Sequence, residues 1–87
     1  MYKIIIRESA FKQLKKIQKP DAKRIESAIN ALSEIPRPIG FKKLKGFYED
    51  LYRIRIGDYR VIYTIEDKIQ VIDVRQIGHR KDIYKLP

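Results

Sequence analysis

The chain of 87 residues is too short for two cores of ordinary size, so we expect one domain over residues 1–87. Its 44% hydrophobic content argues against disorder, and the absence of cysteine excludes disulfides and thiolate metal sites. Twenty Lys and Arg against eleven Asp and Glu give a net charge of +9, which indicates nucleic acid or an acidic protein as partner. No apolar run approaches the roughly 18 residues of a membrane span, so we expect a cytoplasmic protein with no membrane partner.

The first two predicted elements are a strand and a short helix. Three consecutive isoleucines favour a β-strand over residues 2–7, because branched side chains suit a pleated, buried surface. Phe11, Leu14 and Ile17 then recur every three residues, which places them along one face of a helix. The lysines between them are expected to point outward: Lys12, Lys15 and Lys16.

A second helix is predicted after Pro20, which ends the first one. Asp21 offers an N-cap, and apolar side chains follow at helical spacing. They are Ile25, Ala28, Ile29 and Leu32. The helix is expected to end near Ile35, where the sequence PRPIG supplies two prolines and a glycine that force a loop of about ten residues.

The second half of the chain predicts three antiparallel strands. Gly57 and Asp58 form a turn signal between two alternating runs, which predicts a hairpin of residues 51–56 with residues 59–65. The last strand, at residues 69–77, does not alternate cleanly, as is typical of a strand flanked on both sides.

The expected fold is α+β, with the element order β-α-α-β-β-β. Two N-terminal helices should pack on one face of a four-stranded, mainly antiparallel sheet. A basic segment at residues 42–45, followed by a turn at Gly46, leads into the hairpin. Because two short helices cannot cover both faces of such a sheet, the other face should be at least partly open.

Alternation sorts the hairpin side chains by face. In the first strand a tyrosine and two isoleucines share the side that should face the core, whereas Arg53 and Arg55 share the other side. In the second strand the apolar-rich set again takes the core side, so Arg60 joins them in an exposed position. Three guanidinium groups on one open face can donate paired hydrogen bonds to phosphate oxygens, which predicts an anion-binding site.

Further candidates follow the last strand. A loop after Gly78 could bring Arg80 toward the same patch, and Tyr84 comes four residues later. The plainer interpretation is that each arginine is a solvated surface residue and that Tyr84 is a packing residue. His79 is either a candidate proton acceptor or a loop histidine that merely titrates.

Metal and cofactor chemistry are not expected, because the sequence has a single histidine and no glycine-rich phosphate loop. If the site is catalytic, the reaction that demands least of the protein is attack by an RNA 2′-hydroxyl on the adjacent phosphodiester. The substrate then carries its own nucleophile. The protein needs only to orient the RNA and neutralise charge, which arginines do without a metal.

The segments LKG, YRIRIGDYRVIYTI and VRQIGHRKDIY, in this element order, resemble the RelE/ParE superfamily of toxins over nearly the whole chain. Similarity to RelE implies the toxin of a type II toxin–antitoxin system, acting as a ribosome-dependent, metal-independent endoribonuclease. Such a toxin cuts mRNA in the ribosomal A site and inhibits translation.

The resemblance also implies residue roles. The catalytic set would be Arg53, Arg55, Arg60, Arg80 and Tyr84. The three hairpin arginines would stabilise charge in the transition state, Arg80 would lie opposite the leaving oxygen, and Tyr84 would stack on a base or orient the nucleophile. RelE members carry lysines at positions 53 and 55, whereas arginine is a poor base, so the proton acceptor is open, with His79 as the candidate. RNA or ribosome contacts are expected from Lys42, Lys43, Lys45 and Lys81.

The implied partners are mRNA with the ribosomal 30S A site, and a RelB-like antitoxin that is acidic and partly disordered when free. Toxin and antitoxin would form a hetero-tetramer. Two alternatives stay open: a ParE-like inhibitor that binds DNA gyrase without catalysis, and a degenerate toxin fold that serves as a binding module. The full set of four arginines favours the ribonuclease.

Overall fold

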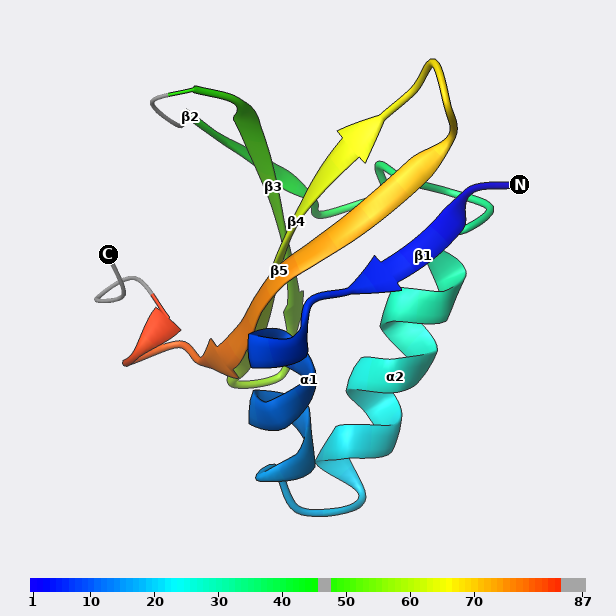
Figure 1. Cartoon of the computed structure of the whole chain (residues 1–87). Coiled ribbons are helices and arrows are strands. Elements are labelled where there is room, and N and C mark those ends of the chain that lie inside the picture. Colours follow the sequence, from blue (N-terminus) through cyan, green and yellow to red (C-terminus); the bar gives the residue numbers. More distant parts are fainter. Residues whose placement is uncertain (46–47, 84–87) are drawn as a thin grey trace.

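The computed structural model describes residues 1–45 and 48–83, in which two helices pack on a five-stranded sheet (Figure 1). The elements in chain order are β1 (Lys3–Ile6), α1 (Glu8–Lys15), α2 (Asp21–Ala31), β2 (Lys42–Lys45), β3 (Asp50–Ile56), β4 (Tyr59–Glu66) and β5 (Val71–His79). The strands lie in the order β1-β5-β4-β3-β2, with β1 parallel to β5 and the other neighbours antiparallel. The predicted α+β class with two helices on a mainly antiparallel sheet is confirmed, with one strand more than expected.

The additional strand is β2, which the basic segment before the hairpin forms. Lys42 to Lys45 pair with β3, from Arg53 back to Asp50. The sequence KKLK carried no strand signal, since strands are usually recognised by branched and aromatic residues. Lysines are nevertheless suited to an edge strand, because their charges oppose further pairing at that edge.

Helix α1 turns a different face toward the sheet than predicted. Ala10 and Leu14, one helical turn apart, are buried, whereas Phe11 is 45% exposed. The helix starts immediately after β1 and packs on β5. The small Ala10 side chain lets the helix approach the strand closely, so tertiary packing overrides the three-residue spacing that favoured Phe11.

Ile25 and Ile29 of α2, and Leu32 at its C-cap, are buried, as predicted. Asp21 is not its N-cap: it is the first helical residue, Pro20 occupies the cap position, and no side chain forms a cap hydrogen bond. The helix also ends earlier than predicted, at Ala31, before a turn that precedes the prolines.

The core lies between the helices and the inner face of the sheet, but the outer face is less open than expected. Arg60, Ile62 and Thr64 of β4 are buried, with 9%, 5% and 3% exposure. Side chains on this face are exposed chiefly toward its periphery, as at Ile5 of β1 and Arg55 of β3. The central strand is therefore enclosed on both faces.

A β-bulge explains why the last strand does not alternate cleanly. Ile62 pairs with Gln76 and Tyr63 pairs with Val74, which leaves Arg75 as an extra residue on β5. The strand runs two residues further than predicted and ends at His79. In the described part of the chain no helix has the length and apolarity to cross a membrane.

Candidate functional site

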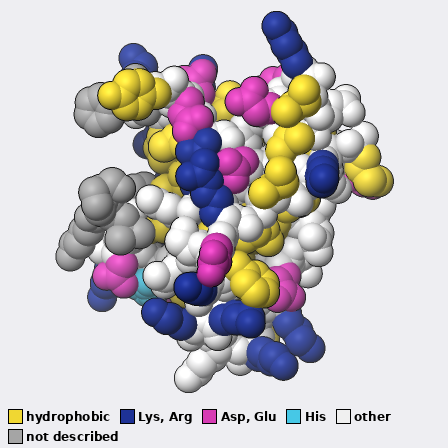
Figure 2. Space-filling view, viewed as in Figure 1, with side chains coloured by type: hydrophobic (Ala, Val, Ile, Leu, Met, Phe, Trp, Pro, Cys, Tyr) yellow, Lys and Arg dark blue, Asp and Glu magenta, His cyan; other side chains and the backbone are white. Residues whose placement is uncertain are grey.

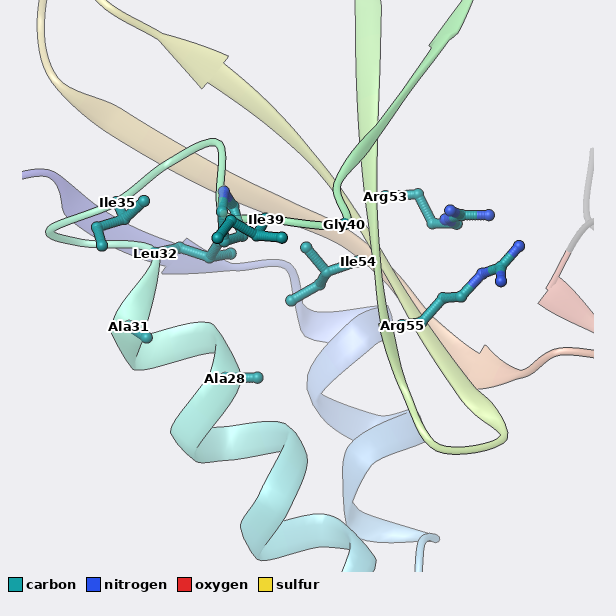
Figure 3. A pocket seen from close by; sticks show the side chains of 10 residues that line it. Ala28, Ala31, Leu32, Ile35, Ile39, Gly40, Arg53, Ile54 and Arg55 are labelled. Carbon is teal, nitrogen blue, oxygen red and sulfur yellow. The ribbon is translucent and has the colours of Figure 1, made fainter.

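The three hairpin arginines share the outer face of the sheet, as predicted. Arg55 of β3 lies directly opposite Arg60 of β4, and Arg53 lies opposite Ile62. Figure 3 shows the side chains of Arg53 and Arg55 extending together, away from α2, while Ile54 points toward the helix. The alternation in the sequence therefore gave the correct side for each residue.

Their exposure differs from the prediction. Arg53 is 6% exposed and Arg60 is 9% exposed, so of the three only Arg55 is exposed. The Nη1 atom of Arg60 donates hydrogen bonds to the carbonyl oxygens of Gly57, at 3.0 Å, and of Tyr59, at 2.9 Å. These bonds hold the guanidinium at the hairpin turn without cancelling its charge, because a carbonyl group is neutral.

Arg80 meets the same turn from the end of β5. Its backbone N–H donates to the carbonyl oxygen of Asp58 at 2.7 Å, and its Nε lies 3.6 Å from Asp58 Oδ1. The Arg80 side chain is 55% exposed. Arg60 and Arg80 are thus both anchored on the turn at Gly57 and Asp58, which the sequence predicted only loosely from chain order.

Gly57 is favoured at this turn by its backbone conformation. Its φ is +59°, in the left-handed region that favours glycine. A Cβ added there would lie 3.6 Å from both terminal nitrogens of Arg24, which comes from α2. The turn therefore brings a third guanidinium, one that sequence reasoning missed, close to the peptide that binds Arg60.

His79 lies apart from the arginines. It pairs with Tyr59 across the sheet, and alternation places both on the helix side, opposite to Arg55 and Arg60. The two rings meet edge to face, with their centroids 5.7 Å apart. Nδ1 of His79 accepts a hydrogen bond from the backbone N–H of Lys81 at 3.1 Å, so the ring is held in the turn after β5.

The predicted lysine contacts are divided between the faces. Lys42 lies opposite Arg53 and shares its face, whereas Lys43 lies on the other side of β2 and forms an ion pair with Asp50 at 3.3 Å. Lys45 and Lys81 are exposed. Tyr84 lies outside the described residues.

The other half of the outer face carries arginines whose charge is cancelled. Arg75 donates Nε to Asp73 at 2.9 Å and forms a two-pronged ion pair with Glu49, one bond of which measures 2.9 Å. Glu49 precedes β3 and Arg75 belongs to β5, so this pair crosses over β4. Hydrogen bonding to Glu49, more than to Asp73, raises the pKa of Arg75.

A network missed by the sequence reading fixes the loop after α2. Arg37 donates to Asp67 at 3.0 Å and to the hydroxyl of Tyr52 at 3.4 Å, and Tyr2 donates to Asp67 at 2.6 Å. Hydrogen bonds from Arg37, and next from Tyr2, lower the pKa of Asp67. Burial raises the pKa of Tyr63 to about 12, and its hydroxyl donates to the carbonyl of Pro36 at 2.7 Å.

That loop borders an apolar cleft of about 550 Å³ between α2 and β3 (Figure 3). Ile35 and Ile39, on its rim, are 60% and fully exposed. Arg53, Ile54 and Arg55 of β3 contribute to its lining, although the side chains of the two arginines extend away from α2. Among the described residues, no group of three His, Asp or Glu side chains is placed to hold a metal ion.

Comparisons with known proteins identify the class. The profile of the family described as "ParE toxin of type II toxin-antitoxin system, parDE" matches residues 4–84. The chain therefore belongs to this toxin family and, more broadly, to the RelE/ParE superfamily.

Individual relatives are RelE toxins. Toxin RelE3 of Methanocaldococcus jannaschii is 36% identical over 94% of both chains. Toxin RelE of Mycobacterium tuberculosis is 30% identical over 98% of this chain and 88% of its own. The archaeal RelE–RelB complex from Pyrococcus horikoshii OT3 contains a chain with 34% identity and a TM-score of 0.81, which covers 91% of this chain and 94% of the other. The protein is thus a RelE-type toxin of a toxin–antitoxin system.

Proposed function

We propose that the chain is a ribosome-dependent endoribonuclease that cuts mRNA in the ribosomal A site and thereby inhibits translation. The observation that carries this proposal is the anchoring of Arg60 and Arg80 on one turn, with Arg55 directly across from Arg60. Arg60 and Arg80, held on this turn, and Arg55 beside them would form a site for a phosphodiester whose negative charge increases in the transition state.

The reaction would be a transesterification. The 2′-oxygen of the RNA forms a bond to phosphorus, and the proton of the 2′-hydroxyl leaves to a base. The bond from phosphorus to the 5′-oxygen breaks, and the 5′-oxygen takes up a proton from solvent, so the products are a 2′,3′-cyclic phosphate and a 5′-hydroxyl. Arg55 and Arg60 would stabilise the phosphorane oxygens, and Arg80 would lie nearest the leaving 5′-oxygen. Arginine stays protonated, so these residues supply charge stabilisation and not the base.

The proposed inhibitory partner is a RelB-like antitoxin, since the similar archaeal RelE occurs in a RelE–RelB complex. An acidic, partly disordered antitoxin could neutralise a chain of charge +9 by folding across its basic surface. A hetero-tetramer of two toxins and two antitoxins is the proposed assembly.

The decisive test is cleavage of mRNA on programmed ribosomes by the purified chain and by Arg80→Ala. The wild type should produce ends at A-site codons, and Arg80→Ala should lose at least about 100-fold in rate, as expected for removing one preorganised donor. Lys68→Ala, an exposed cation at the far end of the sheet, serves as control and should cut normally. Intact mRNA in the presence of the wild-type chain would refute the proposal.

A second candidate function is supported by the family profile, which is named for ParE toxins. ParE-like action would consist of binding DNA gyrase without any cleavage of RNA. The same wild-type preparation should therefore be tested for inhibition of supercoiling. Inhibition with untouched mRNA would favour this function, whereas mRNA cleavage with normal supercoiling would exclude it.

A further inference from the structure

A second concentration of positive charge lies outside the site described above, at the end of the helical hairpin. Residues 12–24 contain six Lys and Arg against one acidic residue, Asp21, and so hold five of the nine excess positive charges of the chain. Figure 2 shows Lys and Arg side chains gathered at the lower end of the molecule, where Figure 1 places the α1–α2 connection. We call this surface the hairpin patch; it comprises Lys15, Lys16, Lys19, Lys23 and Arg24.

The charge of the hairpin patch is not cancelled within the chain. Its four lysines are exposed, and none of them forms an ion pair within residues 1–45 and 48–83. Arg24 pairs with Asp21 at 3.5 Å, but both side chains are more than 40% exposed, so this contact is weak.

Helix stability explains only part of the patch. Lys15 and Lys16 lie at the C-terminal end of α1, where a positive charge favours the helix dipole. Lys23 and Arg24 lie in the first turn of α2, where the dipole is already positive and added cations are unfavourable. A cost of this kind is offset when an external anion binds.

The hairpin patch is continuous with the outer-face arginines. The terminal nitrogens of Arg24 come within 3.6 Å of the Cβ position at Gly57, and the carbonyl of Gly57 accepts the hydrogen bond from Arg60. Positive charge thus extends from α2 around the turn between β3 and β4 to Arg80. One polyanion can contact both surfaces at once.

We propose that the hairpin patch binds the sugar–phosphate backbone of folded, double-stranded RNA beside the strand held on the outer face. This proposal rests on the RNA-directed function proposed above. Lysines act as point charges toward phosphate and carry no base specificity. Single-stranded RNA usually binds by stacking its bases on aromatic rings, whereas the five residues of the hairpin patch are all Lys or Arg. The neighbouring ring of Phe11 is 45% exposed, and the Nζ atom of Lys15 lies 4.9 Å from its centre, so positive charge stands over that ring as well.

The test compares two charge-matched variants of the whole chain. Lys19→Gln/Lys23→Gln removes two charges from the hairpin patch, and Lys3→Gln/Lys68→Gln removes two exposed charges elsewhere. The probes are a labelled RNA hairpin of about 20 base pairs and a single strand of about 12 nucleotides, titrated by fluorescence anisotropy between about 50 and 200 mM KCl. Thermal unfolding checks that both variants fold like the wild type.

The patch variant should bind the RNA hairpin about tenfold more weakly at low salt, and the slope of log K against log salt should fall by about 1 to 2, one unit per lost phosphate contact. The control variant should bind within about twofold of the wild type, because its charges lie away from the patch. Equal weakening in both variants, loss of single-strand binding alone, or loss of affinity only for an acidic antitoxin peptide would overturn the proposal.

This outcome is separate from that of the proposed function. Binding of the RNA hairpin requires no cleavage. If the wild-type chain binds through the hairpin patch but leaves mRNA intact, the proposed ribonuclease function is refuted and the proposed RNA binding by the patch stands. If the wild-type chain cuts mRNA and both variants bind the RNA hairpin equally well, the proposed RNA binding by the patch is refuted and the proposed ribonuclease function stands.

Discussion

The outer face of the sheet has two halves that use arginine in different ways. In one half, Arg75 is surrounded by the carboxylates of Glu49 and Asp73, so its charge is cancelled. In the other half, Arg60 donates to two neutral carbonyl groups and keeps its charge. Both arginines are at least partly buried, so the two halves differ in the chemical nature of the hydrogen-bond acceptor and not in burial.

The largest effect on activity should come from a substitution in the half where Arg60 keeps its charge. Arg60→Ala should reduce the rate of mRNA cleavage on programmed ribosomes by about 100- to 1000-fold, because it removes a preorganised donor from the proposed site. Both carbonyl bonds use Nη1, so Arg60→Lys keeps the charge but lacks the further N–H groups of the guanidinium, and its rate should fall between those of Ala and the wild type. A cleavage rate for Arg60→Ala within about threefold of the wild type, with a normal unfolding curve, would contradict the assignment.

A substitution in the half where the charge of Arg75 is cancelled should lower the stability of the protein and leave its activity unchanged. Arg75→Ala should lower the free energy of unfolding by about 1–2 kcal/mol, because it leaves Glu49 without this charged donor and leaves the partly buried Asp73 with the longer contact from Arg7. Its cleavage rate should stay within about threefold of the wild type. Arg7→Ala is the control: Arg7 is 52% exposed and reaches the same Asp73 only at 3.3 Å, so its loss should cost about 0.5 kcal/mol or less.

The sequence predicted six of the seven elements in their order, the core residues of the second helix and the common side of the three arginines, because alternation and helical spacing are local properties. It missed β2, since lysines give no strand signal, and it missed the bulge at Arg75, which only pairing reveals. The burial of Arg60 could not be predicted from the sequence either. Alternation tells which face of the sheet a side chain lies on, but not whether other residues cover that face. Arg37 and Asp67 meet across 30 residues, so their contact depends on tertiary structure alone.

The cluster of Arg37, Asp67 and Tyr2 allows a smaller effect, on stability, to be tested by varying the pH. The pKa of Asp67 is lowered in the folded state, so its carboxylate contributes stability that is present above the ordinary Asp pKa of about 4 and is lost as pH falls through the lowered value. Asp67→Asn should therefore be less stable than the wild type at neutral pH, and the difference should shrink in acid. Urea unfolding between about pH 2 and pH 7 measures it.

Glu66→Gln provides the control for this titration, because Glu66 is exposed and forms no ion pair within the described ranges. Its stability should parallel that of the wild type at every pH. A difference between Asp67→Asn and the wild type that persists unchanged in acid would show that the carboxylate charge is not what fixes the loop.

The smallest effect concerns Asp58, the one carboxylate at the charged turn. Its ion pair with Arg80 is long, at 3.6 Å, and exposed, so it is worth less than about 1 kcal/mol. In Asp58→Asn the backbone bond from Arg80 to residue 58 remains, so Arg80 should stay in place while a charge that repels RNA is lost. We expect KM for the programmed ribosome to fall about twofold with kcat unchanged, measured beside Asp82→Asn, an exposed carboxylate after β5, as control. A fall in kcat of more than about tenfold in Asp58→Asn alone would instead place this carboxylate in the chemical step, as the proton acceptor that the arginines cannot be.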